Sequence, residues 1–147
     1  LVLGIFILTI LFCGCSAIFK EPTVKVEDIE LTNINATDLE MEITLLIDNP
    51  NPFGVMFEKI TADVSYPKDD EWIPLSHIEK ENIDIIPGKS TVVLPVSAKN
   101  MDLIKAGFTM LKAREITIKV TGVAQPSFFG ITPEIPFSET KTIPLKI

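Results

Sequence analysis

The stretch ITLLIDNPNPFGVMFEKITADV, residues 43–64, contains two alternating patterns of side chains on either side of a turn sequence. Before the turn, apolar side chains occupy every second position, namely Leu39, Met41, Ile43, Leu45 and Ile47. After it, the same alternation appears at Ile60, Ala62, Val64 and Tyr66. Successive side chains of a β-strand point to opposite faces, so each run predicts a strand with one buried face and one hydrated face.

The turn between these strands is rich in residues that fix the backbone. It consists of Asp48, Asn49, Pro50, Asn51, Pro52, Phe53 and Gly54. The carboxylate and the two amide side chains can bond to backbone N–H groups ahead of them as Asx turns, and the prolines fix φ and remove two donors. Gly54 is expected to turn the chain with a positive φ. Two interpretations remain open: a rigid structural corner, or a ligand or partner site at that corner.

Five further segments complete a set of about seven predicted strands. They are residues 23–31, 72–86, 90–99, 115–122 and 142–147. The first changes its apolar phase between Val26 and Ile29, which predicts a β-bulge. The segment 72–86 contains a proline and is predicted to be an edge strand or a strand broken by a turn.

One segment follows a helical period instead. Ile104, Phe108 and Leu111 are spaced by four and three residues, and Asn100 is a suitable N-cap, so we predict an α-helix near residues 101–113. Strands followed by one late helix, with no alternation of strands and helices, predict a mainly β protein. The expected architecture is an antiparallel sandwich with the helix at one end.

Residues 1–19 carry no charge and end in small residues. A run of about 18 apolar residues can span a bilayer, and small residues at its end suit a cleaved leader. The pair Gly14-Cys15 resembles a prokaryotic lipoprotein box, which makes Cys15 a candidate for lipidation. An uncleaved anchor helix is the alternative. We expect attachment to a membrane by lipid or by helix, with the folded domain on the extracytoplasmic face.

Composition excludes several classes of function. The chain has 20 acidic and 13 basic residues, and a net charge of −7, so it repels polyphosphate and nucleic acid is not an expected partner. No cysteine follows Cys15, so the domain has neither a disulfide nor a sulfur-ligated zinc site. Cys13 lies two positions earlier, where the two side chains would not face each other on a helix.

The search for catalytic and binding residues finds only weak candidates. His77 is the one histidine, and we expect it to have a structural or surface role. The acidic run at residues 68–71 lacks the spacing of a calcium loop and predicts a solvated hairpin tip. Trp72 is expected in the core or as a cover of that hairpin, and Asn35 is a weak glycosylation candidate. We therefore predict no enzyme, no metal and no cofactor.

The alternating strand that runs into Asn49-Pro50-Asn51-Pro52, and then into a second strand, resembles the WHy domain. This is the water-stress and hypersensitive-response domain of the atypical, folded late-embryogenesis-abundant proteins. The resemblance covers about residues 22–147, after the leader at residues 1–19. It implies a fibronectin-III-like or immunoglobulin-like sandwich in a non-enzymatic protein that protects against desiccation and other stress. The alternative is an interaction module, an accessory part of a cell-envelope or surface complex with a protein partner.

Overall fold

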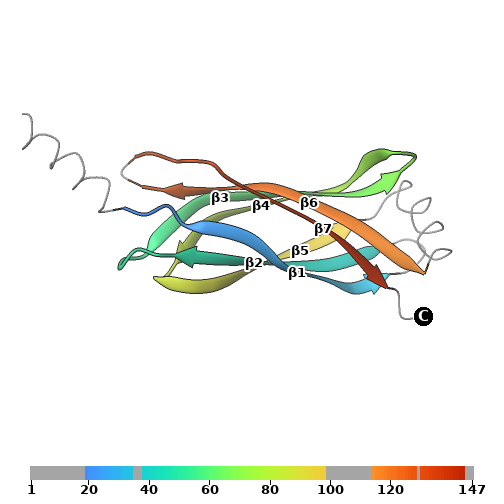
Figure 1. Ribbon diagram of the computed structural model, residues 1–147, viewed down its shortest axis with the longest axis horizontal. Coiled ribbons are helices and arrows are strands. Elements are labelled where there is room, and N and C mark those ends of the chain that lie inside the picture. Colours follow the sequence, from blue (N-terminus) through green and yellow to red (C-terminus); the bar gives the residue numbers. More distant parts are fainter. Residues whose placement is uncertain (1–18, 35–37, 99–113, 129, 145–147) are drawn as a thin grey trace, which may run out of the picture.

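The computed structural model describes residues 19–34, 38–98, 114–128 and 130–144, which form seven β-strands (Figure 1). The strands are β1 (Thr23–Ile34), β2 (Leu39–Asn49), β3 (Val55–Lys68), β4 (Glu71–Ile85), β5 (Gly88–Ala98), β6 (Glu115–Ser127) and β7 (Ile135–Pro144). The prediction of about seven strands is confirmed. Cys15, Asn35 and the predicted helix at residues 101–113 lie outside the described residues. Within those residues, no helix has the length and apolar character needed to cross a bilayer.

The strands form two antiparallel sheets, as predicted. One has the order β1-β2-β5 and the other the order β4-β3-β6-β7. Figure 1 shows the two sheets as layers whose strands run along the long axis of the molecule. The sheets approach each other at both edges, where β1 lies beside β7 and β4 lies beside β5. The result is a β-sandwich.

The core lies between the two sheets and is built from the alternating side chains. The inward residues predicted for β2 are each at most 1% exposed. The alternating apolar side chains of β3, β5 and β6 are also buried: Ile60, Ala62, Val64, Tyr66, Val92, Leu94, Val96, Ala98, Ile116, Ile118 and Val120. Burial of each large aliphatic side chain stabilises the fold by about 1.5–3 kcal/mol. Among the described residues, the buried polar side chains are those of Asn49 and Asn51.

Irregular strands account for the differences between pattern and structure. The predicted bulge in β1 is present, as a register shift between Val26 and Asp28. β4 is an edge strand, as predicted, and continues without a break through Pro74, beside a register shift. The last strand was placed too late by its pattern, because β7 starts at Ile135 rather than at residue 142. Only Ile135 and Phe137 in its first half face the core, so the alternation is too short to recognise.

Candidate functional site

Four segments meet at one end of the sandwich, which we call the N-proximal end. They are residues 19–22, 50–54, 86–87 and 128–134, the last without residue 129 in the described structure. The ladders bring them together, because the start of β1 pairs with the end of β2 and the end of β2 pairs with the start of β5. The start of β3 likewise pairs with the ends of β4 and β6. The predicted motif at residues 48–54 therefore lies at this end (Figure 1).

Asn49 links two of these segments through its buried side chain. Its Nδ2 donates to the carbonyl oxygen of Phe53 at 3.0 Å and to that of Ile86 at 3.4 Å. Its Oδ1 accepts from the backbone N–H of Asn51 at 3.1 Å, which is the predicted Asx turn, and from Asn51 Nδ2 at 2.9 Å. Both donors and both acceptor positions of the amide are occupied. The β2–β3 corner is thereby fixed to the β4–β5 turn.

The side chain of Asn51 bonds to the backbone of Lys20, in the segment before β1. Its Nδ2 donates to the carbonyl oxygen of Lys20 at 2.7 Å, and its Oδ1 accepts from the N–H of Lys20 at 2.8 Å. The side chain acts for Lys20 as a neighbouring strand would. Since all four N–H donors of the two amides bond within the protein, the geometry favours the rigid corner over a ligand site at Asn49 and Asn51.

Two predictions about the corner are wrong. Asp48 is half-buried and its side chain bonds to no other described residue, because its backbone is already fixed as the end of a β2 ladder. Gly54 does not have a positive φ; within the described chain, the glycines that do are Gly88 and Gly130. The prolines and the hydrogen bonds of Asn49 turn the chain instead, and both prolines are exposed.

An aromatic cluster forms beside the corner. The rings of Phe19 and Phe128 stack with centroids 3.5 Å apart and planes at 20°, and Phe53 lies 6.4 Å from Phe128 at 12°. Three side chains at this end are exposed, Phe53 by 38%, Ile86 by 65% and Ile131 by 66%. The sequence pattern missed the aromatic cluster because its three rings come from three separate segments.

His77 lies in a charged network on the outer face of the four-stranded sheet. Its Nδ1 lies 2.6 Å from Asp63 Oδ1, and its Nε2 lies 3.4 Å from Glu79 Oε1, which also pairs with Lys59 Nζ at 3.3 Å. The hydrogen bond to Asp63, followed by that to Glu79, raises the pKa of His77. The hydrogen bond from His77, followed by that from Lys59, lowers the pKa of Glu79. These groups are exposed, so His77 has the predicted surface position.

We expect the Asp63→Asn variant to lower the pKa of His77 toward its ordinary value, because it removes the strongest partner of the imidazolium. NMR titration of the imidazole protons measures this shift. A raised folded-state pKa stabilises the protein fully below the unfolded value of about 6.5, and the stabilisation is lost as the pH rises through the folded pKa. The Glu30→Gln variant in β1 is the control. An unchanged His77 titration in Asp63→Asn would contradict the assignment.

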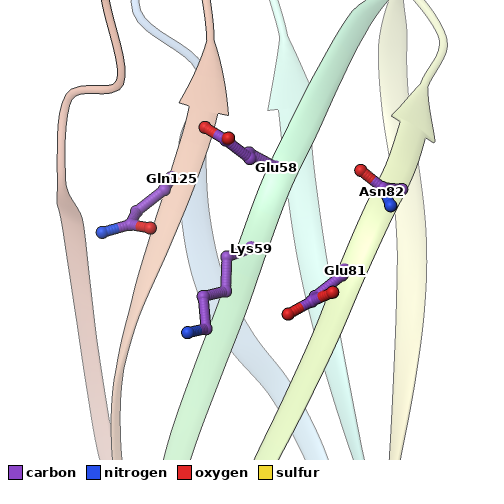
Figure 2. A pocket seen from close by; sticks show the side chains of 5 residues that line it. All are labelled: Glu58, Lys59, Glu81, Asn82 and Gln125. Carbon is purple, nitrogen blue, oxygen red and sulfur yellow. The ribbon is translucent and has the colours of Figure 1, made fainter.

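A shallow depression of about 340 Å³ lies on the same sheet, lined by Glu58, Lys59, Glu81, Asn82 and Gln125. It forms at a register shift between β3 and β6 after Phe57. Figure 2 shows these side chains spread over three strands without converging on one point. Within the part of the chain that the structure describes, no group of three or more His, Cys, Asp or Glu residues could hold a metal ion. The depression offers no arrangement suited to acid–base chemistry.

The acidic run forms a hairpin tip at the opposite end of the sandwich, as predicted. Asp69 and Asp70 connect β3 to β4 with φ values of 50° and 63°, and a two-residue hairpin turn with two positive φ angles matches the twist of the strands. Trp72 is 42% exposed and lies beneath Lys119, whose Nζ is 5.0 Å from the ring centroid. Trp72 therefore does not lie in the core but covers the hairpin, which is the second of its two expected positions.

A sequence model of the family described as late embryogenesis abundant protein matches residues 44–141. The chain belongs to the late embryogenesis abundant family. The match begins in β2 and ends in β7, so it includes the corner with both buried asparagines. Membership of the late embryogenesis abundant family suggests a stress-related, non-enzymatic protein.

Two relatives of this late embryogenesis abundant chain come from Methanocaldococcus jannaschii, and both are named only as uncharacterized proteins. The first is 31% identical over 125 residues, which cover 85% of this chain and 70% of the relative. The second is 32% identical over 117 residues, which cover 76% of this chain and 26% of the relative. This chain thus spans about a quarter of the second relative.

Solved structures share the fold of this late embryogenesis abundant protein. A solution structure from Arabidopsis thaliana has a TM-score of 0.66 at 16% identity, and the match covers 86% of this chain and 83% of the Arabidopsis chain. A solution structure described as that of a late embryogenesis abundant protein has a TM-score of 0.65 at 13% identity, and covers 92% and 77%. A crystal structure from Archaeoglobus fulgidus has a TM-score of 0.58 at 9% identity, and covers 83% and 98%.

Proposed function

We propose that the protein is a non-enzymatic, stress-protective protein that acts during desiccation and is held at a membrane by its N-terminal segment. The observation that carries this proposal is the family match from β2 to β7, which includes the corner of the WHy-type pattern. The order β1-β2-β5 facing β4-β3-β6-β7 supports a fibronectin-III-like or immunoglobulin-like arrangement.

The distribution of charge supports a protective role. The net charge is −7, and every charged side chain in the described part of the chain lies at least partly at the surface. Like charges keep molecules apart, and charged side chains retain water, so an acidic surface opposes close association as water is lost. The protective surface would surround a core formed by apolar side chains of both sheets.

The start of the described chain supports attachment. Phe19 packs against the core and stacks on Phe128, while Lys20 is bonded at both its N–H and its carbonyl to Asn51. The uncharged residues 1–18 directly precede this fixed point of the sandwich in the sequence. We propose that it anchors the domain on the extracytoplasmic face, either by lipid on Cys15 or as a helix.

We expect the protein, reconstituted in liposomes, to preserve the activity of an enzyme that is inactivated by drying. The enzyme is dried and rehydrated with these proteoliposomes, with empty liposomes, or with empty liposomes plus an equal mass of an inert globular protein. Recovery greater than with both controls is expected. Equal recovery in all three samples would contradict the protective role.

Mass spectrometry of the mature protein from membranes distinguishes the two attachments. A chain that starts at Cys15 and carries a diacylglyceryl group indicates a lipoprotein, and retention of the preceding residues indicates an anchor helix. A mature protein recovered without lipid and without these residues would contradict attachment.

An interaction module in a cell-envelope complex is the second candidate. The exposed side chains of Phe53, Ile86 and Ile131 favour it, because clustered apolar side chains at a surface are typical of binding sites. The occupant of that surface decides between a protein partner and the membrane itself.

A further inference from the structure

Charge is distributed unevenly along the long axis of the sandwich. The three loops of the N-proximal end, at residues 50–54, 86–87 and 128–134, contain a single charged residue, Glu134 just before β7, although 22% of the chain is charged. The hairpin tip at the other end reads Lys68-Asp69-Asp70-Glu71. The loops at residues 50–54 and 86–87 can therefore leave water without desolvating a charge, whereas the hairpin tip cannot.

The N-proximal end also presents apolar side chains. Phe53, Ile86 and Ile131 each come from a different loop and are exposed by 38%, 65% and 66%. The stacked rings of Phe19 and Phe128 lie beside Phe53 and support it. Such side chains gain free energy when they enter the boundary between headgroups and acyl chains.

We propose that the N-proximal end inserts its apolar side chains into the boundary between headgroups and acyl chains of the bilayer to which the N-terminal segment is attached. We call this contact the seat. The inference rests on the proposed membrane attachment. The occupant follows from where the chain leaves the sandwich: residues 1–18 are uncharged and join at Phe19, within the aromatic cluster. With Lys20 fixed by Asn51, a segment inserted in the bilayer brings this end, and no other, to the lipid surface.

This seat fixes the orientation of the domain. β3 runs from the N-proximal end to the hairpin tip and has 14 residues. At 3.2–3.4 Å per residue it spans about 45 Å, so the acidic tip and Trp72 lie well above the lipid. Because the contacts are apolar and the domain is acidic, anionic lipid adds no attraction.

The single tryptophan of the chain makes the orientation measurable. The full chain is reconstituted in phosphatidylcholine vesicles with and without acyl chains brominated along their length. Native Trp72, at the far end, is expected to keep its emission. In the double variant Phe53→Trp/Trp72→Phe, the tryptophan at position 53 is expected to lose about half of its emission to the brominated lipid and to shift to the blue, since interfacial side chains sit about 5–10 Å deep.

A matched pair of variants tests the apolar contact. Both are made in the Phe53→Trp/Trp72→Phe variant. Adding Ile86→Asp/Ile131→Asp is expected to abolish the quenching. Adding Val93→Asp, at an exposed apolar residue within β5, is expected to leave the quenching unchanged. Circular dichroism and the denaturant midpoint verify that each variant is folded. Replacing a third of the lipid with phosphatidylserine is expected to leave the quenching unchanged.

The outcomes separate this inference from the proposed function. A chain that fails to float with the vesicles overturns both membrane attachment and the seat. A chain that floats, but whose tryptophan at position 53 is not quenched, overturns the seat alone and favours a protein partner for this end. Quenching that persists in the Ile86→Asp/Ile131→Asp variant also overturns the apolar seat.

Discussion

The Asn49→Asp variant is expected to lower the free energy of unfolding by about 4 kcal/mol at neutral pH. Asn49 is 1% exposed, and its Nδ2 donates to the carbonyl oxygens of Phe53 and Ile86. A carboxylate of the same size has no proton to donate and places a buried negative charge against two carbonyl oxygens. Urea denaturation monitored by circular dichroism measures the change.

The control for this variant lies next to it in the sequence. Asp48 is half-buried and its side chain bonds to no other described residue, so Asp48→Asn should change the stability by less than about 0.5 kcal/mol. Burial raises the pKa of the introduced carboxyl in the folded state, so the penalty should diminish as the pH falls below that value. Equal midpoints for Asn49→Asp and the parent chain would contradict the structural role of this amide.

The strands of the fold could be predicted because their signal is local. The alternation in β2 or β5 depends only on one strand with one buried face, and every inward residue predicted there is buried. β7 was placed too late because only Ile135 and Phe137 in its first half face the core. From Ser138 onward β7 has no buried side chain, so the strand leaves a weak pattern.

The corner could be located from its residues, but not its bonding. Asn and Pro at residues 49–52 predict a turn, and the Asx bond between Asn49 and Asn51 follows from local geometry. The partner of Asn51, Lys20, is 31 positions away and is brought near by the pairing of β1 with β2. No local pattern encodes such a contact.

The N-proximal end was not predictable because its surface is assembled from separate loops. Phe53, Ile86 and Ile131 belong to three separate turns, and no local pattern relates them. Their shared position depends on strand order and register, which fix which loops lie at the same end. Once that order is known, the scarcity of charge in the three loops becomes one property of one surface.

The Gly122→Ala variant is expected to lower the free energy of unfolding by about 3 kcal/mol or more, measured by urea denaturation. A Cβ at Gly122 in β6 would lie 2.2 Å from the carbonyl oxygen of Thr61 in β3, and 2.3 Å from Cζ of Phe137 in β7. Both neighbours belong to the same sheet, and Phe137 is buried, so the methyl group can be accommodated only by moving a strand or the ring.

Two comparisons isolate the cause of that loss. The Gly54→Ala variant, where a Cβ would lie 3.4 Å from the carbonyl oxygen of Ile85 and φ is not positive, should cost less than about 1 kcal/mol. Adding Phe137→Ala to Gly122→Ala removes the contact with the ring but not the contact with Thr61. In a double-mutant cycle the two substitutions should therefore be less destabilising together than the sum of their separate effects. A Gly122→Ala protein as stable as the parent would contradict the close approach of β6 to its neighbours.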